Sequence, residues 1–405
     1  MGKRTEGATG AGVERFVFGR AGRPAKRTVP LVVLIAALTA AFASGPPLGA
    51  APDAPSEIQA APGSDAAAKP KKSLSAFPIL MYDSDIGVGY GGKAKFVNYL
   101  RRRESFDLIL FNSSKGERWY VFTFSIPDTE IRQGTRYGLS FDLRAEYDKY
   151  VKYRFYGLGP DSLKADETVA SYLKEEMGLT VGHGFSPVVV AEAAYVLRRY
   201  KTFNVTPGQP FSDVLQAEGT KFSPYLSLTV RYDTSNSQIH PTRGVRFLVQ
   251  NDFAGPAVAN KAGTYYRMTL DLRSYNRLFF KGAVLAVRGL VQQVTGSNIP
   301  LWDLSTLGGG STMSAMRGYA LNRFMDKGKF LACAEFRFPI WKRLGGNAFT
   351  EAGLVWPRWS AIAFRKTAVD AGWGLRYYLA NFVVRFDMGF SREGTGIYFN
   401  FGHLF

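Results

Sequence analysis

Apolar and polar residues alternate one by one along most of the chain from Val88 to the C-terminus. In the clearest run, residues 137–147, bulky apolar side chains occupy almost every second position, and Gly, Ser, Asp, Arg and Glu lie between them. Side chains on a β-strand point alternately to its two faces, so such a run predicts a strand with one apolar and one polar face. Residues 226–233 and 267–273 show the same pattern.

This alternation predicts an all-β chain that forms a 16-stranded antiparallel transmembrane β-barrel. Most of the runs reach the roughly 9–11 residues that a tilted strand needs to cross a bilayer. An even number of strands allows closure without an exposed edge. The predicted strands cover residues 88–98, 106–113, 118–126, 136–147, 150–156, 168–180, 185–199, 219–232, 243–253, 264–278, 282–295, 329–340, 346–355, 366–379, 382–390 and 395–405.

The connections between these runs alternate in length. Short ones are predicted at Asp148-Lys149, Lys281-Gly282 and Leu344-Gly345, and the longest covers about residues 296–328. Outer-membrane barrels have short periplasmic turns and longer extracellular loops, so this spacing favours the same fold. A soluble β-sandwich would explain any single strand, but it explains the number and length of the strands less well.

The chain ends on an alternating apolar run, GIYFNFGHLF, whose final residue is a phenylalanine. Alternation places Ile397 and the last three phenylalanines on one face, which suits lipid, and the opposite face suits a watery lumen. Such an ending is typical of the last strand of an outer-membrane barrel. The predicted C-terminal strand signal consists of Phe399, Asn400, Phe401, Gly402 and Phe405.

The N-terminal part predicts export. A basic segment precedes an apolar run, Val29–Ala43, that ends on small residues, as in a secretory signal peptide. We therefore expect a signal peptide over residues 1–43. The Ala- and Pro-rich residues 44–76 predict a disordered periplasmic leader, and the barrel is expected over residues 77–405.

The chain is basic, with 51 Lys and Arg against 33 Asp and Glu. The arginines are spaced singly along strands and are not clustered with aromatic platforms, so the charge does not indicate nucleic-acid binding. A charged barrel interior and loops that face lipopolysaccharide account for it better. The single cysteine, Cys333, excludes an intrachain disulfide.

The long connection contains a glycine-rich segment, GGGSTMSAMRGY, over Gly308–Tyr319. Glycines allow a sharp bend that would send the guanidinium of Arg317 back into the lumen. Alternation places Glu335 and Glu351 on the lumen face of the next two strands, so we predict that Arg317 pairs with one or both of them. The alternative is a solvated loop arginine.

Residues for catalysis or for metal and cofactor binding are not expected. The three histidines, His183, His240 and His403, have no serine and carboxylate arranged with them in the sequence. No zinc-ligand spacing is present, and Gly308–Gly310 lacks the Lys-Ser/Thr of a phosphate-binding loop. The sequence therefore predicts a protein that is not an enzyme.

Several segments together resemble the BamA/TamA superfamily, also called bacterial surface antigens. They are the GGGSTMSAMRGY loop, the AEFRFP, FTEAGLVW and GWGLRYYL strands, RFDMGF and the final FNFGHLF, within residues 225–405. The resemblance implies that the loop tip Arg317-Gly318-Tyr319 folds into the lumen and that its arginine meets acidic strand residues. Many members carry periplasmic POTRA modules, and this chain resembles the branch without them.

The resemblance implies a location in the bacterial outer membrane and a role in inserting or translocating proteins or lipids there. A weak seam between the first and last strands would serve as a lateral gate. Expected partners are outer-membrane lipid and lipopolysaccharide, the barrel assembly machinery for the chain's own insertion, and an unknown client protein. A passive channel, selective for anions through inward arginines, is the alternative, and an outer-membrane hydrolase has the least support.

Overall fold

The computed structural model describes residues 72–83, 87–379 and 383–405. The predicted signal peptide, residues 1–43, and residues 44–71 of the predicted leader lie outside the described residues. Every element described below belongs to one compact unit.

Within the described residues, 17 strands form one sheet. Each strand is antiparallel to its partners, so the chain is all-β, as predicted. The strands are β1 (Ser73–Asp83), β2 (Gly87–Val97), β3 (Ser105–Ser113), β4 (Arg118–Ile126), β5 (Tyr137–Phe155), β6 (Thr168–Gly184), β7 (Val189–Phe203), β8 (Thr220–Phe222), β9 (Tyr225–Asp233), β10 (Gly244–Ala254), β11 (Thr264–Arg277), β12 (Val284–Ser297), β15 (Gly328–Trp341), β16 (Leu344–Trp356), β17 (Ala368–Tyr378), β18 (Val383–Ser391) and β19 (Gly394–Phe401).

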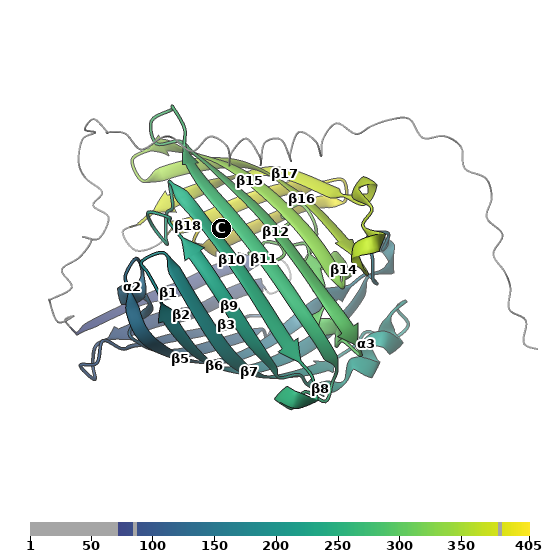
Figure 1. The fold of residues 1–405 in the computed structure, drawn as a ribbon. Coiled ribbons are helices and arrows are strands. Elements are labelled where there is room, and N and C mark those ends of the chain that lie inside the picture. The colour runs from purple at the N-terminus through teal and green to yellow at the C-terminus, as the bar shows by residue number, and fades with distance from the viewer. Residues whose placement is uncertain (1–71, 84–86, 380–382) are drawn as a thin grey trace, which may run out of the picture. The chain divides into compact units, whose positions relative to one another are not determined.

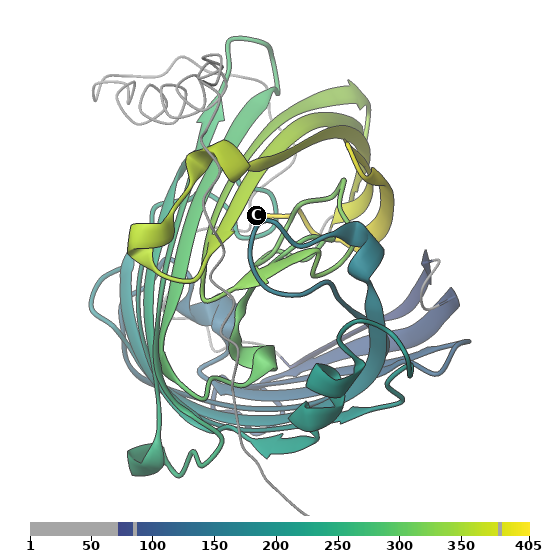
Figure 2. The same ribbon diagram turned by 90° about the vertical axis from the view of Figure 1, so that its right-hand side faces the viewer.

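Strands pair with their neighbours in sequence from β1 to β7 and from β9 to β12, then through β15 to β19. β7 pairs with both β8 and β9, which carries the sheet past the short β8. The sheet curls around a central space, and the connection between β12 and β15 lies inside the curl (Figures 1 and 2).

The connections contain the remaining elements. Strands β13 (Ser305–Leu307) and β14 (Phe324–Asp326) form a small hairpin within the β12–β15 connection. The helical segments are α2 (Thr129–Arg132), η1 (Lys164–Asp166), α3 (Ser212–Glu218), η2 (Pro256–Val258), η3 (Leu301–Asp303), η4 (Trp359–Ala361) and η5 (Phe364–Lys366). No helix in the described part of the chain is long and apolar enough to cross a membrane.

Two predicted boundaries near the N-terminal end were wrong. The predicted turn at Asp148-Lys149 does not exist, because both residues continue β5 and pair with β6. Strand β1 begins at Ser73, inside the segment 44–76 that was assigned to a leader, and no strand was predicted there. The prediction of sixteen strands therefore divided β5 into two strands and omitted β1.

The predicted closure of the barrel is not observed. β1 pairs with β2 and β19 with β18, and in the described residues no ladder joins β1 to β19, although the two strands approach each other. Both strands carry residues that suit an edge. Pro78 in β1 lacks an N–H to donate. Gly402, with φ of +78°, ends β19 and turns the chain inward.

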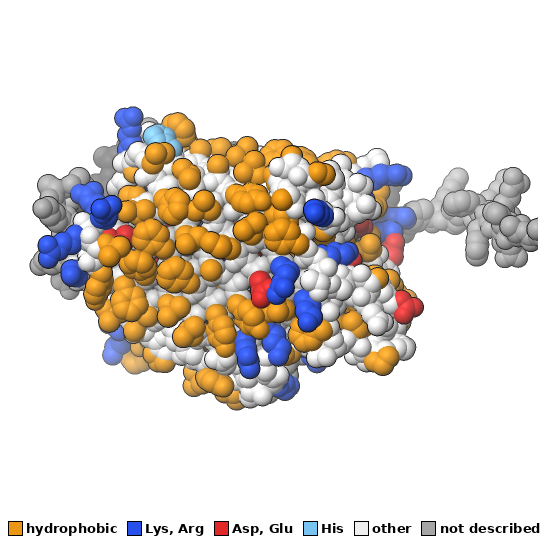
Figure 3. All heavy atoms as spheres, turned by 90° about the horizontal axis from the view of Figure 1, so that it is seen from below, with side chains coloured by type: hydrophobic (Ala, Val, Ile, Leu, Met, Phe, Trp, Pro, Cys, Tyr) orange, Lys and Arg blue, Asp and Glu red, His pale blue; other side chains and the backbone are white. Residues whose placement is uncertain are grey.

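The two faces of the sheet differ in polarity. Large apolar side chains such as Leu179, Leu228 and Val230 are exposed on the outer face, and Figure 3 shows a broad hydrophobic band across the strands. Charged side chains point into the curl, where Arg288 pairs with Asp271 at 2.7 Å. An apolar outside and an ionic inside are what an outer-membrane barrel requires.

The main apolar core lies inside the curl, between the β12–β15 connection and the C-terminal strands. Leu307, Met316 and Phe324 of the connection pack with Leu290 of β12 and Leu331 of β15, and all five side chains are buried. The connection therefore acts as a plug for this half of the interior.

Candidate functional site

The tip of the connection, residues 308–319, folds back on itself before it meets the strands. Gly308 and Gly309 adopt positive φ angles of 122° and 84°, which L side chains rarely adopt. The Gly308 N–H donates to the Ser314 carbonyl at 2.7 Å, and Gly309 forms a bridge with Met316. This turn aims the following residue, Arg317, into the interior.

Arg317 lies at the centre of a buried charge cluster. Its Nη1 is 2.8 Å from Glu335 Oε1 and 2.9 Å from Asp387 Oδ2, and its Nη2 is 2.8 Å from Glu351 Oε1. The guanidinium carbon also lies 3.4 Å from the centroid of the Phe349 ring. Glu335 and Glu351, the two carboxylates proposed from the sequence, thus contact the guanidinium together with Asp387. Glu351 also accepts the Arg317 backbone N–H at 2.6 Å.

Gly318 and Tyr319 continue the contact along the last strands. The Gly318 N–H donates to Asp370 Oδ2 at 2.7 Å, and its carbonyl accepts a hydrogen bond from Ser391 at 2.6 Å. The Tyr319 hydroxyl donates to the Val369 carbonyl at 3.3 Å. The tip is therefore tied to β17 and β18 through its backbone as well as through the arginine.

Glycines on β18 and β19 leave room for the tip. A Cβ at Gly389 would lie 2.4 Å from the Arg317 carbonyl carbon, and one at Gly396 would lie 2.2 Å from the Arg317 carbonyl oxygen. Backbone atoms cannot move aside as a flexible side chain can. These two positions must therefore be glycine for the tip to approach the strands this closely.

Three more arginines join the cluster. Arg337 and Arg376 contact Glu335, while Arg376 and Arg385 contact Asp387. A buried charge is tolerated when it is paired and hydrogen-bonded. The cluster holds equal numbers of guanidinium and carboxylate groups: Arg317, Arg337, Arg376 and Arg385, with Glu335, Glu351, Asp370 and Asp387.

Sequence reasoning did not assign Asp370 or Phe349 to the contacts of the loop tip. The signal was available, because alternation along residues 368–376 places Asp370 on the same face as the inward Arg376. Asp387 lies on the same face of β18 as Arg385, but the sequence did not show that it contacts the loop tip. Alternation does not show which inward residues lie at the same depth in the interior, because this depends on the strand register.

The C-terminal residues divide into two groups. Phe399 and Phe401 are exposed on the outer face, as the alternation predicted. Asn400 is exposed, and its Oδ1 accepts the Phe401 N–H at 2.8 Å. The placement of Phe405 on that outer face was wrong. Gly402 breaks the alternation, and Phe405 is buried against Arg337 in the interior.

The tail after Gly402 is held inside the curl by side chains from three other segments. Arg337 Nη2 donates to the Phe405 carbonyl at 2.8 Å, and the Thr312 hydroxyl donates to the Leu404 carbonyl at 3.0 Å. His403 lies 2.9 Å from His240, which belongs to the connection between β9 and β10. His403 therefore faces the interior.

The two histidines are neutral where they meet. Burial lowers the pKa of His240 to about 4, and the cationic Arg337 and Arg277 act in the same direction. Burial lowers the pKa of His403 well below its ordinary value, with Arg337 and Arg376 adding to the effect. A hydrogen bond between two imidazoles needs one donor and one acceptor, so at least one of the two rings must be neutral, and protonation of both would break the contact.

Beside β5–β9 the ion pairs differ in exposure: Arg198 of β7 is buried with Asp303 of the β12–β15 connection, whereas two other arginines remain in contact with solvent. Arg231 pairs with Glu192, and its side chain is 47% exposed. Arg144 lies 2.8 Å from Glu146 and is 45% exposed. Arg231, one of the inward arginines of the anion-channel alternative, is thus matched by a carboxylate, and so is Arg144.

The described residues contain no group of three or more His, Cys, Asp or Glu side chains that could hold a metal ion. His183 contacts the ring of Phe185, and the other two histidines contact each other. The arrangement of charges in the interior is therefore best understood as structural, with the loop tip as its centre.

The comparisons with known proteins agree with this geometry. The profile of the Omp85 superfamily domain matches residues 107–405. No curated protein sequence matches the chain. Among solved structures, a BamA from Haemophilus ducreyi that lacks POTRA domains 1–3 is 15% identical, with a TM-score of 0.59, over 82% of this chain and 70% of that chain.

Two CdiB structures are also similar. CdiB from Acinetobacter baumannii is 13% identical with a TM-score of 0.51, over 80% of this chain and 58% of that one. CdiB from Escherichia coli is 9% identical with a TM-score of 0.54, over 81% of this chain and 61% of that one. At these identities the likeness concerns the fold, and the family profile carries the assignment: the chain belongs to the Omp85 superfamily and is a bacterial outer-membrane protein of the BamA/TamA type.

Proposed function

We propose that this protein inserts or translocates client proteins or lipids at the outer membrane by opening the edge between β1 and β19. The observation that supports the proposal most strongly is that each of these strands has only one hydrogen-bonded neighbour among the described strands. An unpaired strand edge is a template for pairing with an incoming strand. A client strand would add to β1 or β19 and then leave into the bilayer.

The inward tail supports the same proposal. The carbonyl groups of Leu404 and Phe405 are bound by Thr312 and Arg337, so the end of β19 is drawn away from β1. Meanwhile the Arg317 cluster fixes β15–β18 to the loop. One half of the wall would stay rigid while the seam moves. The chain's own insertion would depend on the barrel assembly machinery, and an unfolded outer-membrane protein is the partner that fits the free edge.

The test is a reversible cross-link across the seam. In a Cys333→Ala background, which removes the only native cysteine, cysteine pairs are introduced at outer-face positions of the two strands, with Leu74 or Ala76 on one side and Ile397 or Phe399 on the other. Oxidised and reduced proteins are placed in liposomes, and protease protection measures the insertion of a urea-unfolded eight-stranded barrel. A fluorescent phospholipid provides the lipid readout.

We expect the reduced protein to insert the barrel or transfer the phospholipid faster than empty liposomes do. Oxidation of a seam pair should abolish this rate increase, and reduction should restore it. The matched control joins β18 to β19 through cysteines at Phe386 and Phe399, which are register partners. That disulfide leaves the seam free and should leave the activity unchanged. Equal activity of oxidised and reduced seam variants would contradict the proposal, and so would a reduced protein that performs no better than empty liposomes.

A further inference from the structure

The outer surface of β4–β7 carries a row of basic side chains toward the end of the sheet that holds the β5–β6 and β7–β8 connections. The register places Arg118 opposite Lys149, Lys149 opposite Leu173, and Leu173 opposite Lys201. Arg118 lies four residues from Phe122 and Lys201 four residues from Leu197, which are both exposed on the outer face. Strand periodicity therefore places the basic row, Arg118, Lys149 and Lys201, on that face.

The cations of the basic row have no acidic partner in the part of the chain that the structure describes. The nearest acidic group on this face, Glu175, already pairs with Arg199 in the adjoining row. In Figure 3 basic side chains gather beside the hydrophobic band, with few acidic ones among them. Unpaired cations at the border of an apolar band attract anionic headgroups.

The next row toward the apolar band carries two tyrosines on β4 and β5 and the Glu175–Arg199 pair on β6 and β7. Tyr120 and Tyr147 stack with ring centroids 5.7 Å apart, and each lies two residues from the basic row on its strand. Tyrosine and tryptophan favour the level of the lipid headgroups, where one end of the side chain is apolar and the other is wet. On β4 and β5 the order of basic, aromatic and apolar side chains thus matches the order of phosphate, interface and acyl chain in a bilayer leaflet.

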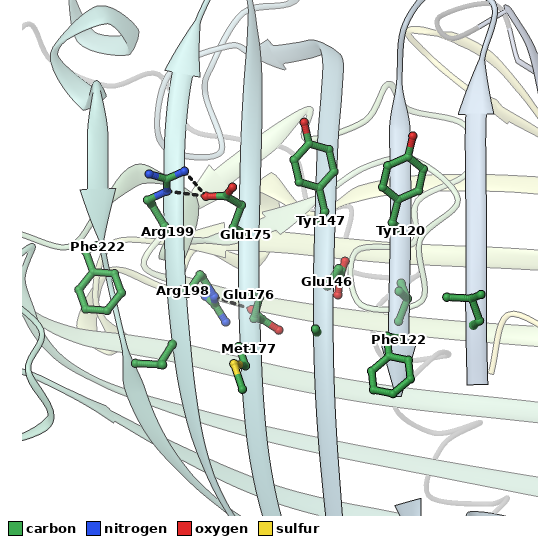
Figure 4. A pocket seen from close by; sticks show the side chains of 14 residues that line it. Tyr120, Phe122, Glu146, Tyr147, Glu175, Glu176, Met177, Arg198, Arg199 and Phe222 are labelled. Atoms are coloured by element: carbon green, nitrogen blue, oxygen red, sulfur yellow. Dashed lines mark hydrogen bonds and ion pairs between the residues drawn. The ribbon is translucent and has the colours of Figure 1, made fainter. Parts of the chain in front are cut away.

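A hollow of about 490 Å³ lies on the apolar side of these rows. Ala145, which is small, pairs with Phe122 on one side and with Met177 on the other, so a depression forms between two large side chains. Figure 4 shows Phe122, Met177 and Phe222 around it, with Arg199 and Glu175 above. The depression is open to the outside and has the lining that an acyl chain needs.

The opposite flank lacks this arrangement. The outward row that joins β9 to β12 near the same connections carries no charge: it consists of Leu226, Phe253, Tyr266 and Thr295. A general requirement for positive charge at the rim would have produced cations there too. The basic row is therefore a local feature of β4–β7.

We propose that β4–β7 bind a phosphorylated glycolipid of the outer leaflet, with its phosphates on Arg118, Lys149 and Lys201 and an acyl chain in the hollow beside Ala145. Neighbouring strands are about 4.8 Å apart, so the row spans roughly 14 Å, enough to contact a headgroup with two phosphates. Arginine and lysine are the side chains that bind phosphate. The site requires the outer-membrane location of the chain, but it does not depend on the seam between β1 and β19.

The test measures binding of lipid A with two phosphates to the full chain in detergent micelles, by native mass spectrometry. Replacing Arg118, Lys149 and Lys201 together by Gln should weaken binding by about tenfold or more, because each cation near an anionic lipid surface contributes roughly 1 kcal/mol. The matched control removes three exposed cations at the other end of the sheet, through Arg102→Gln, Lys281→Gln and Arg343→Gln, and should bind like the wild type. Lipid A with one phosphate should bind more weakly to the wild type.

A second variant tests the acyl part without changing any charge. Ala145→Trp fills the hollow and should weaken lipid A binding while the protein still shows the gel shift of a folded barrel on heating. Three outcomes would overturn the proposal. They are equal losses in the basic-row and control triple variants, unchanged binding in Ala145→Trp, and competition by inorganic phosphate at the concentration of the lipid, which would indicate a simple anion site.

Discussion

Two arginines in the interior, Arg317 and Arg231, differ in how deeply they are buried and in how many partners they have. Beside β15–β18, the side chain of Arg317 has no exposed area, and three carboxylates, an aromatic ring and the loop backbone surround it. Beside β6–β9, Arg231 has one carboxylate partner and remains about half exposed. Both side chains point inward, Arg317 from a loop tip and Arg231 from a strand. Alternation alone does not show which of the two is buried. The difference arises because the tip of the β12–β15 connection, residues 308–319, encloses the guanidinium of Arg317, whereas the side chain of Arg231 stays open to solvent.

This difference determines what each ion pair contributes. On the packed side, a charge that loses its partner stays out of water. Removing that partner therefore lowers the free energy of unfolding by several times what the ion pair itself contributes. In the open side, water and salt screen the pair and replace a missing partner. The packed side is therefore suited to stay fixed, and the open side, together with the seam, is suited to change.

The largest expected effect comes from removing the central guanidinium. Arg317→Ala leaves Glu335, Glu351 and Asp387 buried without their shared cation and should lower the free energy of unfolding by about 3–5 kcal/mol. The measurement is the urea midpoint of the protein in lipid vesicles, with heat resistance of the folded form on gels as a second readout. A midpoint equal to that of the wild type would show that the cluster does not hold the loop.

A smaller loss is expected where a strand makes room for the tip. Gly389→Ala places a methyl group 2.4 Å from backbone of Arg317, and overpacking of this kind costs about 1–3 kcal/mol. Gly178→Ala on β6 is the matched control, because its Cβ would meet only Val196 at an ordinary 3.7 Å. Similar losses in both variants would mean that strand glycines matter for reasons other than the tip.

The histidine pair predicts a pH dependence at the tail. Unfolded histidines take up protons below about pH 6.5, whereas His240 in the folded protein does so only near its lowered pKa of about 4. The unfolded state therefore binds more protons in this window, and stability, complete above about pH 6.5, should fall as the pH drops toward 4.

The urea midpoint between pH 7.5 and pH 4.5 measures this effect. His240→Gln should flatten the pH dependence, because it removes one partner of His403. The control, His183→Gln, removes a histidine of β6 that does not contact the tail, and it should keep the wild-type slope. A slope that His183→Gln reduces as much as His240→Gln does would rule out the pair as its source.

The smallest effect is expected on the open side. Arg231→Ala breaks a solvent-exposed pair with Glu192, and such pairs contribute about 0–1 kcal/mol. Arg231→Ala and Arg317→Ala make the same substitution at an exposed and at a buried arginine. The difference between their losses of stability therefore measures the effect of burial. A loss as large as that of Arg317→Ala would show that this side is also shielded from water.

The sequence predicted the all-β class and the inward loop tip because both depend on local signals. Period-two alternation identifies β9 and β15, and the glycines before Arg317 indicate a bend. The errors arose where one local sequence pattern is compatible with two different structures. Asp148-Lys149 combines two polar residues that suit either a turn or a long strand, and only pairing with β6 decides. Phe405 continues the alternation in sequence, but the αL turn at Gly402 reverses its direction.

The most direct test of a fixed side and a movable seam is hydrogen exchange of the full chain in lipid, followed by mass spectrometry. Backbone amides of β16, which pair with strands on both sides, should resist exchange for hours. Amides of β1 and β19 should exchange orders of magnitude faster, because local opening there breaks few contacts. Protection of β19 equal to that of β16 would contradict the account, since it would mean that the seam is as firmly closed as the rest of the wall.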